Sequence, residues 1–592
     1  MKKYLRNSIT RVINQLILRI VFSTLIAFVF IQHLQAQSGA SSGASPNQLL
    51  NVTEVIVQWD SIIPTVDFQK ALTPKIIKAV NIYPNSNVSS FDLDVAQAKV
   101  LALPEVARVK WNIELLTGSD SRLVLVVRIA EKAKEGTQKT GIFASGKRGD
   151  FPSLYMDEKS YLKFNLAGNL VPTLIKNTWW GNGKSFTEFN PYGKNPPGPE
   201  AALDFEPYFI AGLSGITRIS NGNVPLYIYG TINALGVATL GDELYNQDSK
   251  TFKFQIEEAY GGIFGAKTTQ SGHLIRFLVS FGKQPYRIGN GMLICQIAGN
   301  GGVWGGMNAW PRFSGKYVGL AKFAYDKWRL EGFYIQPNEY EYNLSHTKLA
   351  GINAEFSQSY GLSGGFTYLN VLDSKFPYFY PDYSQTTREG LNAANLRFQY
   401  MPKPGESFLF AKAEGGLQWN GKINMLAYGM AFEGGWAFGD VNTRPTLSYR
   451  YSLLTGDDPA TDKFERWDIL YSGDDMVTWV QGKLMKNILF NTNLEVNRFQ
   501  LQIFPKGWRL TGQYSFFLAN QLNTIPSPAI GTFSHEQIGQ ETALIVERFV
   551  SRNIYIRMMA TSLWAGKGIT EVLPNPVTKP WTEVIAMLKF SF

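Results

Sequence analysis

Apolar and polar residues alternate along much of this chain, and most clearly at its C-terminal end. In the last stretch Val584, Leu588 and Phe592 fall at even positions, whereas Glu583 and Lys589 fall at odd ones. A period of two predicts a β-strand with one apolar and one mixed face. A chain that ends on its most apolar face is typical of a barrel in the bacterial outer membrane, where that face meets lipid. The alternative is the buried last strand of a soluble sandwich.

The terminal residue adds to this prediction. Phe592, an aromatic residue at the end of such a strand, resembles the signal that outer-membrane insertion machinery recognises. We therefore expect that machinery, and the lipid of the outer membrane of a Gram-negative bacterium, as partners.

The same alternation recurs between residues 153 and 592. In the clearest hairpin Trp328, Leu330 and Tyr334 share one face of a strand, while Arg329 and Glu331 share the other. A charge that faces lipid at mid-membrane costs about 2–4 kcal/mol, so we expect the charged faces to meet water in the lumen. The lumenal set predicted in this way comprises Arg276, Lys322, Arg329, Glu331, Arg397, Lys412, Glu414, Arg450, Glu541, Glu547 and Arg557.

Two interpretations of the lumenal set stay open. Its basic members could attract carboxylates or phosphates into the lumen. Alternatively, the acidic and basic members pair with one another across the lumen and only stiffen the barrel.

Short turns separate the predicted strands on one side, and long segments rich in Gly, Asn, Asp and Pro separate them on the other. At about 24 residues for a strand and its connection, the chain accommodates roughly 16–18 strands, of which we take 18, around an aqueous lumen. The predicted fold is thus an all-β transmembrane antiparallel barrel. Extracellular loops are predicted at 177–199, 338–348, 378–389, 455–475 and 523–535.

The N-terminal part of the chain has a different pattern. Residues 1–36 combine a basic start with a short apolar core, which predicts a signal peptide, with a retained signal anchor as the alternative. Residues 37–50 form a flexible leader. Residues 51–132 follow strand and helix periods in the order β-α-α-β-β, which predicts a small α+β domain in the periplasm. A polar linker, 133–152, precedes the barrel at 153–592.

Apolar residues at helical spacing place the two helices of this domain over 67–80 and 90–103. Either Thr65 or Asp67 could cap the first helix, and Pro104 ends the second.

Two strand segments in this domain carry a family pattern: residues 103–106 followed by Val109, and the closing strand 124–131. With the β-α-α-β-β order they resemble a POTRA domain, the polypeptide-transport-associated module that precedes some outer-membrane barrels. The resemblance implies that residues 51–132 dock a periplasmic protein. A packing or plug domain without a partner is the alternative.

Composition removes several classes of protein. Hydrophobic residues make up 45% of the chain, but the mean hydropathy is −0.11 and no second long apolar run follows the N-terminus, which excludes a helical membrane protein. The formal charge is +10, and five cations with no acid precede residue 37, which leaves 10 − 5 = +5. That charge is too modest and dispersed to predict nucleic-acid binding. The only cysteine, Cys295, is interpreted as a small apolar residue on a strand.

Short motifs follow one another between residues 250 and 592, and together they resemble the barrel of alginate-export and related porin families. One comprises Gly282, Lys283, Gln284, Arg287 and Gly289, and another comprises Gly456, Asp457 and Asp458. The family usually has Arg where Lys283 stands. The resemblance implies an 18-stranded, arginine-lined pore that carries anionic polysaccharide.

Catalytic chemistry is not predicted. After the signal peptide the chain has His273, His346 and His535, and no Ser/His/acid or metal-ligand spacing stands out among them. The aspartates between residues 457 and 475 could bind calcium, but a solvated acidic loop is the simpler interpretation. We expect no enzyme activity, no cofactor and no metal.

The sequence therefore favours an outer-membrane channel or exporter for an anionic solute or polysaccharide. The rival is a POTRA-dependent protein translocase or assembly factor with 16 strands. That family has a Val/Ile-Arg-Gly-Tyr/Phe motif, which is missing here, since residues 274–277 lack the glycine. A surface adhesin or receptor that uses the long loops is a third interpretation.

Overall fold

The computed structural model describes residues 50–592 except 61–63, 83, 85, 117–120, 130–151, 158, 181–197, 199, 221–224, 242–249, 272, 340–343, 381–383, 402–406, 440, 474–480, 525–531 and 552. The predicted signal peptide, nearly all of the leader and most of the linker lie outside the described residues. Among the described residues, no helix is both long and apolar enough to cross a membrane.

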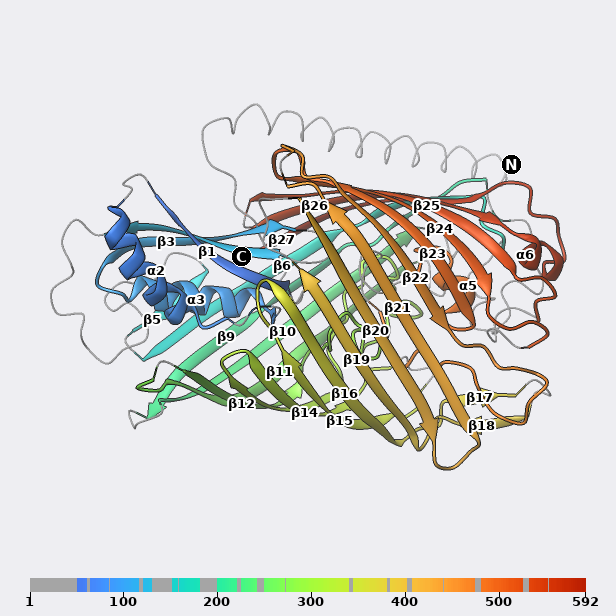
Figure 1. Ribbon diagram of the computed structural model, residues 1–592, viewed down its shortest axis with the longest axis horizontal. Coiled ribbons are helices and arrows are strands. Elements are labelled where there is room, and N and C mark those ends of the chain that lie inside the picture. Colours follow the sequence, from blue (N-terminus) through green and yellow to red (C-terminus); the bar gives the residue numbers. More distant parts are fainter. Residues whose placement is uncertain are drawn as a thin grey trace. The chain divides into compact units, whose positions relative to one another are not determined.

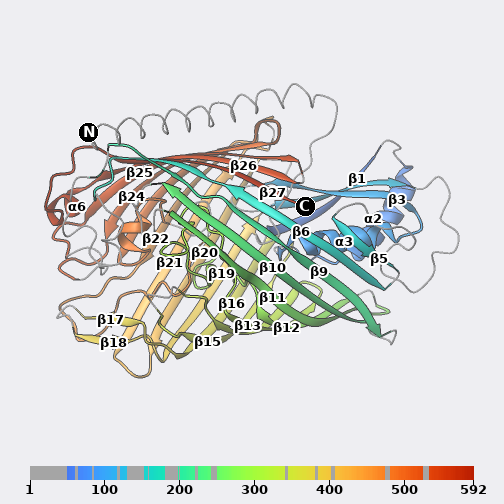
Figure 2. The same cartoon turned by 180° about the vertical axis from the view of Figure 1, so that it is seen from behind.

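The second, larger part of the chain forms one closed antiparallel barrel of 18 strands (Figures 1 and 2). Two of these strands are interrupted: β6 (Ser160–Leu170) continues as β7 (Pro172–Lys176), and β8 (Ala202–Phe205) continues as β9 (Tyr208–Ser220). The barrel closes where β27 (Trp581–Ser591) pairs with β6 and β7. The prediction of 18 strands is confirmed.

The other strands follow one another around the wall in chain order, and each pairs with its predecessor. They are β10 (Leu226–Gly241), β11 (Lys250–Thr268), β12 (Leu274–Lys283), β13 (Tyr317–Tyr325), β14 (Trp328–Gln336), β15 (Lys348–Phe356), β16 (Gly361–Asp373), β19 (Leu391–Met401), β20 (Phe408–Asn420), β21 (Met425–Ala437), β22 (Thr446–Leu454), β23 (Leu494–Ile503), β24 (Trp508–Ala519), β25 (Gln537–Ser551) and β26 (Ile554–Ala565).

The two faces of the wall differ as the alternation predicts. On β14, Trp328 and Leu330 are 62% and 52% exposed on the outside. Glu331, on the other face of the same strand, points inward. On β19, Leu396 and Phe398 are likewise exposed on the outside. A continuous outer band of large apolar side chains is unfavourable in water, and lipid is the solvent that satisfies it. The barrel is therefore a transmembrane barrel.

The connections between strands give the barrel two different ends. Short turns, such as Asp326–Lys327 between β13 and β14, lie at the end where β6 begins and β27 finishes. Long connections lie at the opposite end. We call these the short-turn end and the long-loop end.

The last strand has the two faces predicted for it. Val584 is 42% exposed on the outside, while Glu583 is 1% exposed on the inside. Phe592 exchanges backbone hydrogen bonds with Leu166 on β6. Beyond it β5 (Ser153–Met156) pairs with β6 along the same edge.

Residues 50–129 form a small α+β domain, the N-terminal module. Its sheet has the order β2-β1-β4-β3, in which β1 is parallel to β4. Helices α2 and α3 share one apolar core with this sheet. The short strand β2, between the helices, was not predicted. The strands are β1 (Leu50–Trp59), β2 (Ser86–Val88), β3 (Val106–Leu115) and β4 (Ser121–Ile129), and the helices are α2 (Val66–Val80) and α3 (Ser90–Leu101).

Local chemistry explains where these helices begin. The Thr65 hydroxyl accepts the N–H of Phe68, so Thr65 rather than Asp67 caps α2. Ser89 and Asp92 form a reciprocal capping box at the start of α3. Both caps satisfy backbone donors that have no partner within the helix.

Helix α3 is apolar on two sides, whereas a helix that packs only against its own domain needs one apolar side. Leu93 and Val100 enter the core of the module. Val95 and Ala98, on another side, pack against barrel residues, among them Tyr161 of β6. The helix therefore joins the module to the barrel wall.

Candidate functional site

Two long connections fold into the barrel. Inner loop 1 is residues 284–316, between β12 and β13, and inner loop 2 is the described residues 455–473 and 481–493, between β22 and β23. Inner loop 2 includes α5 (Lys486–Leu489). Ile294 of the first loop and Trp467 of the second are buried in one apolar cluster with inward-facing residues of β13 to β22. The lumen is therefore narrowed by the chain itself.

Two predictions were wrong at this point. Residues 455–473 do not project as a solvated loop but fold inward, because Phe464 and Trp467 are 1% and 2% exposed. Cys295 does not lie on a strand but in inner loop 1, where its N–H donates to the carbonyl of Tyr471 (2.8 Å). Both segments are rich in turn-forming residues, and local pattern cannot distinguish a loop that meets water from one that fills a lumen.

Carboxylates of the barrel wall hold both inner loops by their backbones. Glu206, between β8 and β9, accepts the N–H groups of three consecutive residues of inner loop 1, Met307 to Ala309, at 2.6–2.9 Å. Glu541 on β25 does the same for Lys483, Leu484 and Met485 of inner loop 2, also at 2.6–2.9 Å. Bonds between a carboxylate and backbone N–H groups are stronger than neutral ones. We call Glu206 and Glu541 the loop anchors.

Further contacts support the anchors. Glu257 on β11 accepts the N–H groups of Phe313 and Ser314 at 2.8 and 2.9 Å. The Lys483 ammonium donates to Asn308 Oδ1 (2.8 Å), which ties the two inner loops to each other. Gly482 has φ +86°, and a Cβ there would lie 3.0 Å from the Glu541 carboxylate, so only glycine lets the backbone approach the anchor.

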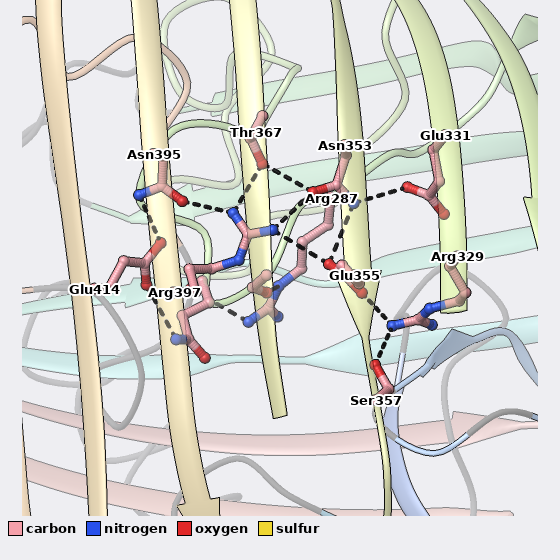
Figure 3. A network of polar contacts seen from close by, with 12 residues as sticks. Arg287, Arg329, Glu331, Asn353, Glu355, Ser357, Thr367, Asn395, Arg397 and Glu414 are labelled. Atoms are coloured by element: carbon pink, nitrogen blue, oxygen red, sulfur yellow. Dashed lines mark hydrogen bonds and ion pairs between the residues drawn. The ribbon is translucent and has the colours of Figure 1, made fainter. Parts of the chain in front are cut away.

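One side of the lumen carries a continuous polar network (Figure 3). Arg397 on β19 donates to Thr367 on β16 (2.8 Å) and to Asn353 on β15 (2.7 Å). Glu355 on β15 pairs with both Arg397 and Arg329. The network thus crosses the wall over several neighbouring strands.

The same network reaches inner loop 1. Glu414 on β20 accepts from Asn290 (3.0 Å), and Glu331 on β14 accepts from the Tyr286 hydroxyl (3.0 Å). At Gly289, φ is +50° and a Cβ would lie 2.6 Å from the Arg397 side chain. The loop backbone therefore passes directly over the charged wall.

Most of the predicted lumenal charges are paired. Lys322 pairs with Glu331 (3.2 Å), and Arg450 pairs with Glu433 (2.8 Å). Glu547 accepts from Arg509 (2.7 Å), with Arg557 at 3.8 Å. Lys412 lies opposite Glu433 in the β20–β21 register. These side chains lie on the inward face of the wall, and Lys322, Arg329, Glu331 and Arg397 line a cavity there.

Arg276 is an exception within the predicted set. It donates to the carbonyl of Asn81 in the N-terminal module (3.3 Å) and lies over the ring of Phe264. It forms no ion pair with any carboxylate of the described residues.

The N-terminal module contacts the barrel at its short-turn end. Asp94 of α3 forms an ion pair with Lys163 of β6, whose side chain is 2% exposed. Arg509, at the start of β24, donates to the carbonyl of Leu116 (3.3 Å). The contacts to β6, β12 and β24 lie on separate parts of the wall, so the module lies across this mouth of the lumen.

Most residues of the first porin-like motif, 282–289, make contacts that hold the backbone of inner loop 1 and the adjoining strands. Lys283 lies 3.7 Å from Glu257 and donates to the carbonyl of Ile256 (2.5 Å). Gln284 donates to the carbonyl of Val318 (2.9 Å), and Gly282 has φ +136°. Arg287 donates to the carbonyl of Gly289 (3.2 Å).

The second motif begins inner loop 2. The N–H of Gly456 donates to Asn520 (2.9 Å), and the N–H of Ala460 donates to Asp458 (2.9 Å). The described residues contain no group of three or more His, Cys, Asp or Glu side chains placed to hold a metal ion.

Asp457 makes the docking of inner loop 2 depend on pH. Its Oδ1 accepts the N–H of Glu465 (2.7 Å), while Oδ2 has no hydrogen-bond partner in the described part of the chain. Burial raises the pKa of Asp457 from 3.8 to about 6. Because the docked loop binds this proton more tightly than the released loop, docking is favoured below about pH 4 and loses this contribution as the pH rises through 6.

Asp457→Asn should remove that dependence. Cys295, the only cysteine, packs beside inner loop 2 and reports its release through the rate of maleimide labelling. The ratio of the wild-type rate to the variant rate should rise between pH 4 and pH 7, and taking the ratio cancels the titration of the thiol. Asp462→Asn, at an exposed position in the same loop, is the control. A ratio independent of pH contradicts the role of Asp457.

The sequence did not reveal Glu206, Glu257, Lys163 or the anchoring role of Glu541. A carboxylate that holds a loop backbone looks the same in sequence as one that faces water. The only available signal was position, since Lys163, Glu257 and Glu541 lie on the inward faces of strands. Glu206 lies between β8 and β9 and gave no such signal.

Comparisons with known proteins find barrels of similar structure, but they assign this chain to no family. No family model and no curated protein matches the sequence. Among solved structures, OccK5 (OpdH) of Pseudomonas aeruginosa is 9% identical with a TM-score of 0.42, over 72% of this chain and 98% of that one. OccK9 (OpdG) of the same organism is 10% identical with a TM-score of 0.45, over 73% and 98%. The outer membrane protein opdK, also from Pseudomonas aeruginosa, is 10% identical with a TM-score of 0.39, over 73% and 99%.

Proposed function

We propose that this chain is an outer-membrane channel for small polar or anionic solutes, and that the N-terminal module gates its short-turn end. The observation that carries the proposal is the closed 18-stranded barrel with an apolar outer band, a charged lumen and two inner loops held by wall carboxylates. A barrel of this size is wide enough for an aqueous channel. Loops that narrow such a lumen select among solutes by size and charge.

The arrangement favours small solutes over a polymer. A polysaccharide in transit would have to displace both inner loops and the module together, whereas a small solute needs only a local opening. The alginate-export resemblance implies export of an anionic polysaccharide. That function would require a larger rearrangement of the inner loops and the module than passage of a small solute.

A protein translocase is the second candidate, and the module favours it. A small α+β domain at the short-turn end is the feature that this class shares with the chain. In that case the module would receive a polypeptide or a periplasmic protein, and the inner loops would leave the lumen during passage. The lack of the lid-loop motif argues against this reading.

Single-channel recording of the full mature protein in planar bilayers tests the proposal. We expect discrete conductance steps of small size, since the inner loops narrow the lumen, with closures caused by the module. A barrel that is closed in salt solution and conducts only when an unfolded polypeptide is supplied would favour the translocase. The channel proposal fails if neither the wild type nor the variants considered in the Discussion conduct.

A further inference from the structure

The N-terminal module, the barrel wall and inner loop 1 together line a cavity of about 330 Å³. Two cations that line it lie near the same aromatic ring: Lys99 of α3 is 5.8 Å from the ring centroid of Phe264, and Arg276 of β12 is 6.0 Å from it. Neither cation forms an ion pair with a carboxylate among the described residues. Two unneutralised cations on one ring repel each other, and an anion bound between them would relieve that repulsion.

The carboxylate that acts on the charge of Lys99 is already engaged. Asp92, one turn earlier on α3, accepts from the backbone N–H and the hydroxyl of Ser89, both at 2.9 Å. Burial and the charge of Arg276 lower the pKa of Lys99 to about 8, and Asp92 opposes that shift only in part. The two cations therefore retain room for an anion.

A third group in the cavity lacks a partner. Asn81, which ends α2, is 9% exposed, and its Oδ1 atom has no hydrogen-bond partner in the described residues. Its backbone carbonyl accepts from Arg276, and Asn81 lines the same cavity as the two cations. A buried acceptor without a donor costs free energy, which a ligand hydroxyl would recover.

We propose that this cavity binds a hydroxylated organic anion, such as a sugar acid, with its carboxylate between Lys99 and Arg276 and a hydroxyl donating to Asn81. The volume lies within the range of small-ligand pockets. The proposal deepens the channel function, on which it rests, by naming a solute class and its site. Because the ligand would contact both the module and the barrel, its binding stabilises the closed arrangement.

Calorimetric titration of the full-length mature protein in detergent with sodium glucuronate tests the site. Lys99→Gln and Arg276→Gln should each weaken binding about tenfold or more, since each removes a charge-assisted contact. Lys99→Arg should retain binding. Lys267→Gln is the matched control, because Lys267 lies on the same end of β11 as Phe264 but is exposed. Glucose, which has the hydroxyls without the charge, and acetate, which has the charge without the hydroxyls, should both bind more weakly than glucuronate.

Two results would overturn the site. One is equal glucuronate affinity in the wild type, Lys99→Gln and Arg276→Gln, with all three shown to be folded by their heat-modifiable electrophoretic mobility. The other is binding of glucose, acetate or inorganic phosphate as tight as that of glucuronate. Bilayer recording separates this proposal from the channel. A conducting protein that binds no glucuronate refutes the site alone, and a protein that binds glucuronate but never conducts refutes the channel alone.

Discussion

Asp94→Asn should raise the fraction of time that the channel is open by about two orders of magnitude. The substitution preserves shape but removes the one negative charge that pairs with Lys163 among the described residues, and the Lys163 side chain is 2% exposed. Leaving one partner of a buried ion pair without its counter-charge costs about 3–5 kcal/mol. Since the pair joins the module to the wall, that cost falls on the docked, closed arrangement.

A double-mutant cycle attributes this effect to the pair. Lys163→Met alone should open the channel less than Asp94→Asn does, because Asp94 still accepts from Trp111 Nε1 (2.9 Å) and lies nearer to water. The double variant should return toward the wild type, since no unpaired charge is left. Asp67→Asn, at an exposed position in the first turn of α2, is the control. Equal open fractions in Asp94→Asn and Asp67→Asn would show that the module does not gate the lumen.

Glu541→Ala should increase the size of each conductance step rather than the frequency of opening. The carboxylate accepts three consecutive backbone N–H groups of inner loop 2, and no other acceptor is present for them in the described structure. A hydrogen bond to a charged group contributes about 1.5–3 kcal/mol, so the loop loses at least about 3 kcal/mol of docking free energy. With the loop released, the lumen widens.

The variant Glu536→Ala is the matched control, since Glu536 is exposed and lies just before β25. Glu541→Gln should have an intermediate effect, because the amide keeps one acceptor oxygen but loses the charge. Glu206→Ala should enlarge the step in the same way through inner loop 1, and the two effects should not add fully, because Lys483 and Asn308 link the loops. An unchanged step size in a correctly folded Glu541→Ala barrel would contradict the anchoring role.

These two predictions separate two barriers along the lumen. The module controls whether the short-turn end is open, and the inner loops control how wide the open path is. An ion pair at the mouth and backbone anchors inside the wall are independent contacts, so open fraction and step size should change independently.

The sequence by itself determined the wall of the barrel. Alternation placed Trp328 and Leu330 outside and Arg329 and Glu331 inside, and the structure agrees. It did so because a lipid-facing strand imposes its requirement on every second residue, which is visible in a short window. The strand number followed from chain length divided by the spacing of turns, and the 18 strands are confirmed.

Only the tertiary structure decided what fills the lumen. Inner loop 2 has the composition of a solvated loop, yet Glu541 and an apolar cluster hold it inside the barrel. The pairing of Lys163 with Asp94 joins residues that are far apart in the chain. Lumenal charges, loop anchors and module contacts depend on which groups meet across the barrel, and periodicity along one strand carries no information about a partner on another. The alternation therefore specifies the barrel wall, and contacts between segments far apart in the chain specify how much of the lumen stays open.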